Sequence, residues 1–135
     1  MNIADRLSEI NWLAVVSVTI LSFILGMLWH SKLLFGKAWK EDTGFDPSKK
    51  INFTLTFGLS AIFNFTAMLG LAAFIGAHTT CMHGLYKGFI VSIIWVSTSI
   101  GATYLFANRP LRLLLIDAGY YVVLFSIAGM LLAVW

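Results

Sequence analysis

The sequence predicts an all-α integral membrane protein, a bundle of four transmembrane helices. Its composition is the first reason: 59% of the 135 residues are hydrophobic and 11% are charged, whereas a soluble domain has about 45–50% apolar and about 25% charged residues. The second reason is that all Asp, Glu, Lys and Arg side chains lie outside four stretches, 10–31, 51–86, 88–108 and 118–135. A soluble protein of this size needs more polar surface. A disordered chain and a disulfide-stabilised secreted domain are excluded as well.

Each charge-free stretch can supply one helix that crosses about 30 Å of hydrocarbon, which takes roughly 20 apolar residues. The expected helices cover residues 11–29, 53–75, 85–105 and 111–135. Their apolar runs are continuous and do not alternate with period 2, which argues against a membrane β-barrel. We expect residues 1–135 to form a single transmembrane four-helix domain.

The basic residues predict the orientation, because Lys and Arg of short loops gather on the cytoplasmic side. Arg6 and Lys87 lie on one side of the expected bundle, and the other seven basic residues lie on the opposite side: Lys32, Lys37, Lys40, Lys49, Lys50, Arg109 and Arg112. This places the loops 31–52 and 108–110 in the cytoplasm and both termini on the outer side of the cell membrane (the inner or cytoplasmic membrane). The net charge of +3 therefore reflects topology and does not indicate a nucleic-acid partner.

The loop 31–52 is the one sizeable piece outside the expected helices. Its first half mixes apolar residues with Lys, which is typical of a segment lying in the membrane interface. Trp29, Phe35 and Trp39 are the expected interface anchors, and residues 41–50 are expected to form a turn. A membrane-associated connector is favoured over a docking site for a partner.

Small residues predict where the helices meet, because apolar side chains gain nothing by leaving lipid. The clearest pattern is a stripe at four-residue spacing, formed by Gly84, Gly88 and Ser92. The first helix offers Ser22 and Gly26. Such stripes indicate packing and do not distinguish a monomer in the lipid bilayer from a homo-oligomer or a complex with a membrane partner protein.

Asp117 is the only acidic residue inside an expected span. It lies six residues past Leu111, or about 9 Å below the cytoplasmic interface at 1.5 Å per residue. A carboxylate in a span is costly and is a functional candidate for that reason. Tyr120 and Tyr121, at i+3 and i+4, share the helix face of Asp117. Residues of the other helices at similar or slightly greater depth complete an expected polar layer, with His30 and Trp29 just above it: Asn64, Ser60, Thr98, Ser99, Ser22 and Gly26.

Two interpretations of Asp117 stay open. In the first, the protein binds or moves a small solute or ion through this polar layer. In the second, the carboxylate is structural and is satisfied by Tyr hydroxyls, by His30 or by Arg109 or Arg112, and the protein is a non-catalytic accessory or scaffold subunit. The residue types favour a structural carboxylate, since ion-pair networks also occur without function, but any functional role belongs at Asp117.

The outer loop, 77–84, contains His78, Cys81 and His83. Their spacing matches no standard copper or zinc site, and one Cys does not complete a four-ligand shell. The sequence also has no catalytic triad pattern, phosphate-binding loop or haem motif. We therefore expect no metal, no cofactor and no enzymatic activity.

Two blocks resemble a bacterial family of small membrane proteins. The first runs from Gly26 to Trp39, and the second comprises 108–112 and 116–120. The family is the domain of unknown function 1761. Here His30 stands where Tyr is usual in the family, and Lys32 where Pro is usual. The resemblance implies four helices in the same order over nearly the whole chain. It implies no established activity.

Overall fold

The computed structural model describes residues 2–135, and over these residues the chain is helical with no β-strand. Four spans are long and apolar enough to cross a membrane. They are α2 (Trp12–Trp29), α4 (Phe53–Ile75), α7 (Leu111–Val134) and Cys81–Phe106, which joins α5 (Cys81–Val91), the π-helical segment η1 (Ser92–Ser97) and α6 (Thr98–Phe106). Two short helices complete the fold: α1 (Ile3–Ser8) precedes α2 in the chain, and α3 (Gly36–Thr43) lies between α2 and α4. The predicted all-α class is confirmed, and so are four helices long and apolar enough to span a membrane.

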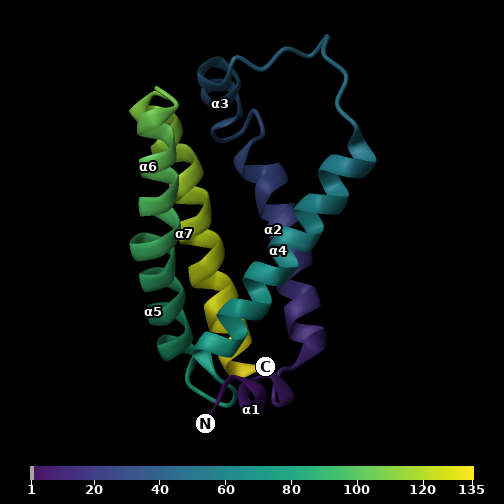
Figure 1. The fold of residues 1–135 in the computed structure, drawn as a ribbon, viewed down its shortest axis with the longest axis vertical. Coiled ribbons are helices and arrows are strands. Elements are labelled where there is room, and N and C mark those ends of the chain that lie inside the picture. Colours follow the sequence, from purple (N-terminus) through teal and green to yellow (C-terminus); the bar gives the residue numbers. More distant parts are fainter. Residues whose placement is uncertain (1) are drawn as a thin grey trace.

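Figure 1 shows that the spans run between two ends of the molecule. The terminal end carries α1, the α4–α5 turn and both chain ends, and the loop end carries α3 and the α6–α7 turn. Helix α4 leans away from α6 and α7 toward the loop end (Figure 1). Large apolar side chains along the first half of α4 are exposed, as expected for a surface that faces lipid: Phe53, Leu55, Phe57, Leu59, Ile62 and Phe63.

Two boundaries differ from the prediction by more than one residue, and each has a specific cause. The third span begins at Cys81 instead of residue 85, because the Thr80 hydroxyl accepts a hydrogen bond from the His83 amide and caps the helix. Residues 81–84 are therefore helical and do not belong to the outer loop. Helix α3 continues to Thr43, past the expected start of the turn at residue 41. Its last turn is held by an ion pair between Asp42 and Arg112.

Helices α5 and α7 make the most extensive helix contact in the molecule. Gly84 lies against the backbone of Gly129, and Gly88 lies against the carbonyl of Phe125, so closely that a Cβ at either glycine would overlap α7. Ser92, the third residue of the stripe, is fully buried. Because the side chain is only a hydrogen at these positions, the two backbones touch and gain dispersion contacts that lipid cannot supply.

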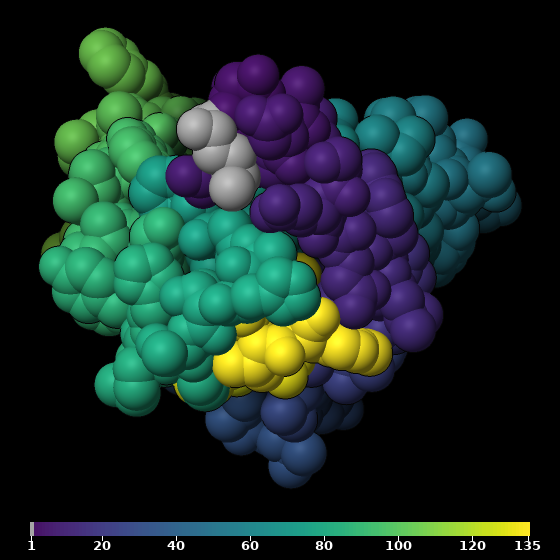
Figure 2. Space-filling view, turned by 90° about the horizontal axis from the view of Figure 1, so that it is seen from below, coloured from purple at the N-terminus to yellow at the C-terminus, as the bar shows by residue number. Residues whose placement is uncertain are grey.

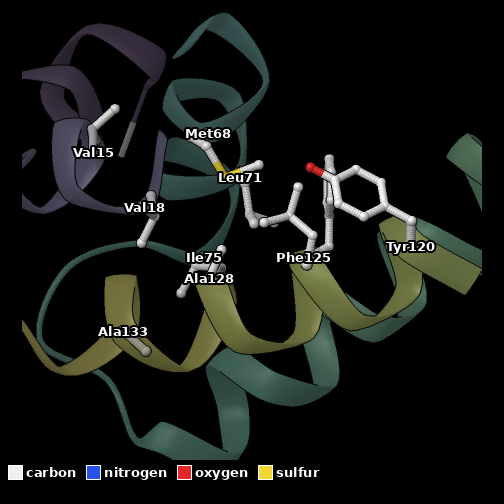
Figure 3. Packing of buried hydrophobic residues seen from close by; sticks show 10 residues of the cluster. Val15, Val18, Met68, Leu71, Ile75, Tyr120, Phe125, Ala128 and Ala133 are labelled. Atoms are coloured by element: carbon white, nitrogen blue, oxygen red, sulfur yellow. The ribbon is translucent and has the colours of Figure 1, made fainter. Parts of the chain in front are cut away.

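The hydrophobic core lies in the half of the bundle nearer the terminal end. Figure 3 shows it stretching along α7 from Ala133 to Tyr120, and the same cluster includes Val15 and Val18 of α2 and Met68 of α4. Seen from the terminal end, the last residues of α7 (yellow) lie at the surface between the N-terminal helices (purple) and the region of α4 and α5 (teal to green) (Figure 2). Since α7 touches every other spanning element, it is the central helix of the fold.

Two basic side chains at the terminal end cap α4. Arg6 donates to the carbonyl of Ala73 at 3.0 Å, and the Lys87 ammonium donates to the carbonyls of Phe74 and Ile75, both at 3.1 Å. The last carbonyls of a helix have no partner within it and carry partial negative charge. Arg6 and Lys87 therefore have a structural role at this end.

We predict that Gly88→Ala destabilises the fold by about 1–3 kcal/mol, the usual cost of overpacking, because its methyl group would push α5 away from the Phe125 carbonyl. Gly70→Ala is the matched control, since a Cβ at Gly70 meets open space and alanine has the higher helix propensity. Thermal unfolding in detergent measures both variants. Equal unfolding midpoints for the two would contradict the assigned α5–α7 contact.

Candidate functional site

Asp117 of α7 is held by side chains from two other parts of the chain. The Tyr104 hydroxyl of α6 donates to Asp117 Oδ2 at 2.5 Å. His30, the residue directly after α2, places Nε2 3.6 Å from Asp117 Oδ1. The side chains of His30 and Asp117 are 31% and 16% exposed, respectively. The carboxylate is therefore partly shielded and still open on one side.

The second ring nitrogen of His30 determines how the ring meets Asp117. His30 Nδ1 lies 2.9 Å from the Gly26 carbonyl oxygen, and a carbonyl only accepts, so Nδ1 carries a hydrogen. A neutral ring would then present the Nε2 lone pair to a carboxylate, which is unfavourable. Protonation of Nε2 turns the contact into an ion pair. The carboxylate of Asp117 therefore raises the pKa of His30 above its ordinary 6.5, an effect that partial burial opposes.

Aromatic side chains fix this arrangement. The Trp29 indole donates from Nε1 to the Ile116 carbonyl at 2.9 Å, one residue before Asp117. The buried Tyr120 hydroxyl donates to the Ser22 carbonyl at 2.6 Å. The His30 ring packs edge-on against Trp39 of α3, with ring centroids 5.4 Å apart. Helices α2, α3 and α7 therefore all contribute to the position of His30.

The acid–histidine pair borders a groove of about 500 Å³, which we call the Asp117 groove. Its walls are largely aromatic and apolar, and Asp117 is its only acidic group. The lining residues come from α6, α7, α3 and the end of α2: His30, Trp39, Ser99, Ile100, Thr103, Tyr104, Asp117, Tyr120 and Tyr121.

The expected polar layer is only partly gathered at this groove. His30, Ser99, Tyr120 and Tyr121 line it together with Asp117. Asn64 lies in an adjoining groove of about 450 Å³, which shares Ser99, Ile100 and Tyr121 with the first. The remaining members lie outside the lining of the Asp117 groove: Ser60, Thr98, Ser22 and Gly26.

Sequence reasoning missed Tyr104 and Thr103, and it assigned Trp39 only to the membrane interface. A signal for Tyr104 was present in the tight turn before Pro110, which brings residues on its two sides to similar depth. A phenol two residues before the end of α6 could therefore have been matched with Asp117 across that turn.

The hypothesis that Arg112 satisfies Asp117 is wrong. Arg112 instead binds α3: its Nε and Nη2 donate to the two carboxylate oxygens of Asp42 at 2.8 and 2.6 Å, and Nη2 also contacts Glu41 at 3.2 Å. These charge-assisted bonds hold the pKa of Asp42 below its usual range. Their effect is to hold α3, and with it Trp39, at the start of α7 beside the Asp117 groove.

The residues of the outer loop do not form a cluster. His78 precedes α5, Cys81 is the first residue of α5, and Cys81 is exposed. Within residues 2–135, no three His, Cys, Asp or Glu side chains gather closely enough to hold a metal ion.

The fold and the site define a multi-pass, helical membrane protein in which a partly shielded carboxylate, Asp117, belongs to a spanning helix near the loop end. The sequence model of the family described as Protein of unknown function (DUF1761) matches residues 13–133. The chain therefore belongs to the DUF1761 family, and the predicted resemblance is confirmed. Comparison with curated proteins and with solved structures gave no match.

We predict that the stability of the protein falls as the pH rises through the raised pKa of His30. A raised pKa in the folded state contributes stability that is complete below the ordinary 6.5 and is lost above the raised value. Thermal unfolding in detergent between about pH 5 and about pH 9 measures this slope. Asp117→Asn should flatten it, and an unchanged slope in that variant would contradict the His30–Asp117 pairing.

Proposed function

We propose that this protein binds a small cationic solute in the Asp117 groove, in competition with a proton on His30. The observation that carries the proposal is the position of Asp117 in a largely apolar groove, 3.6 Å from a titratable imidazole. The proposal assigns cation binding to the expected polar layer around Asp117. It also makes the single four-helix unit of residues 1–135 a binding protein without catalytic groups.

The composition of the groove supports a cation as the solute. Asp117 supplies a negative charge, and four aromatic rings line the same space: Trp39, Tyr104, Tyr120 and Tyr121. Aromatic faces attract ammonium groups, most strongly where water is displaced. A volume of about 500 Å³ falls within the roughly 300–1,000 Å³ typical of small-molecule sites.

Competition with a proton follows from the charges around His30. Asp117 faces the imidazole from α7, the phenols of Tyr104 and Tyr120 lie nearby, and three lysines of the segment 32–40 line a space that His30 also borders. A cation on Asp117 repels the imidazolium and favours loss of its proton. By reciprocity, protonation of His30 weakens binding of the cation.

The orientation we propose places the loop end in the cytoplasm and both termini outside the inner membrane. Seven of the nine Lys and Arg residues belong to the loop-end segments. The other two, Arg6 and Lys87, cap α4, so their position on the outer side has a separate structural reason. The Asp117 groove then lies in the cytoplasmic half of the membrane.

The alternative is an accessory or scaffold subunit in which Asp117 only ties helices together. The observation that favours it is that Trp29, His30 and Tyr120 already join α2 to α7 through hydrogen bonds and the ion pair. In this view the exposed apolar faces of α4 and of the third span contact lipid or another membrane protein.

Titration of the purified protein in detergent with tetraethylammonium tests the proposal. We predict saturable binding that releases protons near neutral pH and strengthens as the pH rises. Asp117→Asn should weaken binding at least about tenfold, the effect of losing one interaction of about 1.4 kcal/mol. Asp46→Asn is the matched control, because Asp46 is an exposed loop residue bonded to Ser48.

His30→Gln should keep cation binding and remove its pH dependence. The proposal fails if Asp117→Asn and Asp46→Asn bind the cation equally well. It also fails if the wild type binds no cation and Asp117→Asn lowers only the unfolding midpoint, which is the result that the accessory role predicts.

A further inference from the structure

A second concave site lies at the loop end, built around lysines instead of a carboxylate. It has a volume of about 340 Å³ and is lined by His30, Lys32, Gly36, Lys37 and Lys40. We call it the lysine pocket. His30 borders both this pocket and the Asp117 groove, so the two sites are neighbours with opposite charge.

The backbone between α2 and α3 forms the lysine pocket. The Phe35 amide donates to the Trp29 carbonyl at 3.0 Å, and the Gly36 amide donates to the Ser31 carbonyl at 2.9 Å. A Cβ at Gly36 would overlap the carbonyl of His30, so only glycine lets α3 begin this close to the end of α2. Lys37 and Lys40, one turn apart on α3, then lie beside Lys32.

The acidic residues nearest in the sequence do not neutralise these lysines. Glu41 and Asp42 bind Arg112, and none of the ion pairs found within residues 2–135 includes Lys32, Lys37 or Lys40. Lys40 makes a cation–π contact with Phe45. Three positive charges that converge on one concave site without a carboxylate create a potential that attracts an anion.

The surroundings of the pocket indicate that the anion is part of a lipid. Leu33 is 84% exposed, and Leu34 and Phe35 beside it are exposed too. They lie four to six residues past Trp29, the last residue of the α2 span, a position at which we expect the hydrocarbon to meet the headgroups. Apolar side chains that enter the acyl region beside lysines at headgroup level are typical of segments that bind anionic membranes.

We propose that the lysine pocket binds the phosphate of an anionic phospholipid in the leaflet at the loop end. Lys32, Lys37 and Lys40 contact the phosphate, and Leu33, Leu34 and Phe35 lie beside the acyl chains. The bound lipid holds α3 against the membrane, and therefore holds Trp39 at the rim of the Asp117 groove. This inference does not depend on cation binding at Asp117.

Native mass spectrometry of the detergent-solubilised protein with dioleoylphosphatidylglycerol tests the proposal, with dioleoylphosphatidylcholine as the neutral comparison. A lysine near an anionic surface contributes about fivefold in affinity, so Lys37→Gln/Lys40→Gln should weaken phosphatidylglycerol binding about 25-fold. Lys49→Gln/Lys50→Gln is the matched control: it removes the same charge from the same loop at exposed residues outside the pocket. The control should change binding by less than about twofold.

Two further variants keep the test decisive if the double Gln variant does not fold. Lys37→Arg/Lys40→Arg retains both charges and should bind within about threefold of the wild type. Lys32→Gln alone should weaken binding about fivefold. Equal losses in the two double Gln variants would overturn the site, because they indicate diffuse attraction to the whole basic loop. Equal binding of the two lipids, or displacement of the lipid by millimolar inorganic phosphate, would overturn it as well.

Discussion

The structure depends on one constraint: apolar side chains of a membrane protein gain nothing by exchanging lipid for each other. Helices therefore hold together only where backbones approach closely or where polar groups bond across the interface. The close backbone contact lies toward the terminal end, where Gly84 and Gly88 bring α5 onto α7 and where Lys87 also bonds to the end of α4. Toward the loop end the links are polar, from Trp29 to Ile116 and from Arg112 to Asp42.

This division explains why the candidate site lies where it does. Near the loop end the helices spread apart (Figure 1), and a groove remains among α3, α6 and α7. The side chains that connect the helices in this region, Asp117, Tyr104 and His30, are also the polar groups of the candidate site. A carboxylate in a span is costly, and the Tyr104 hydroxyl and the His30 imidazole offset that cost. Asp117 therefore has a structural role in addition to its proposed role in binding, and stability and cation affinity have to be measured separately.

The four spans could be predicted closely from the sequence, because long charge-free apolar runs have few alternatives to crossing a membrane. The start of the third span at Cys81 depended on a cap by Thr80, and α3 depended on an ion pair between residues 70 positions apart. Neither feature is encoded in local periodicity. Arg112 was considered as a partner of Asp117. In the structure it pairs with Glu41 and Asp42 of α3 instead.

The members of the site were only partly predictable, because depth can be counted along a sequence whereas rotation about a helix axis cannot. Spacing along the same helix matched Tyr120 and Tyr121 to Asp117, and depth matched Ser99, but depth also included Asn64, which lies in the adjoining groove. The π-helical segment Ser92–Ser97 changes the phase of every residue after it. Counting 3.6 residues per turn from the start of that span therefore could not identify the face that carries Tyr104.

The proposed cation site requires that the Asp117 groove is open to water from the cytoplasmic side. Thiol labelling of Thr103→Cys in a Cys81→Ser background measures this directly, since Thr103 lines the groove without bonding Asp117 and Cys81 is the only native cysteine. A membrane-impermeant cationic thiol reagent should label inside-out vesicles and leave right-side-out vesicles unlabelled. Labelling only from the outer side, or from neither side, would contradict the account.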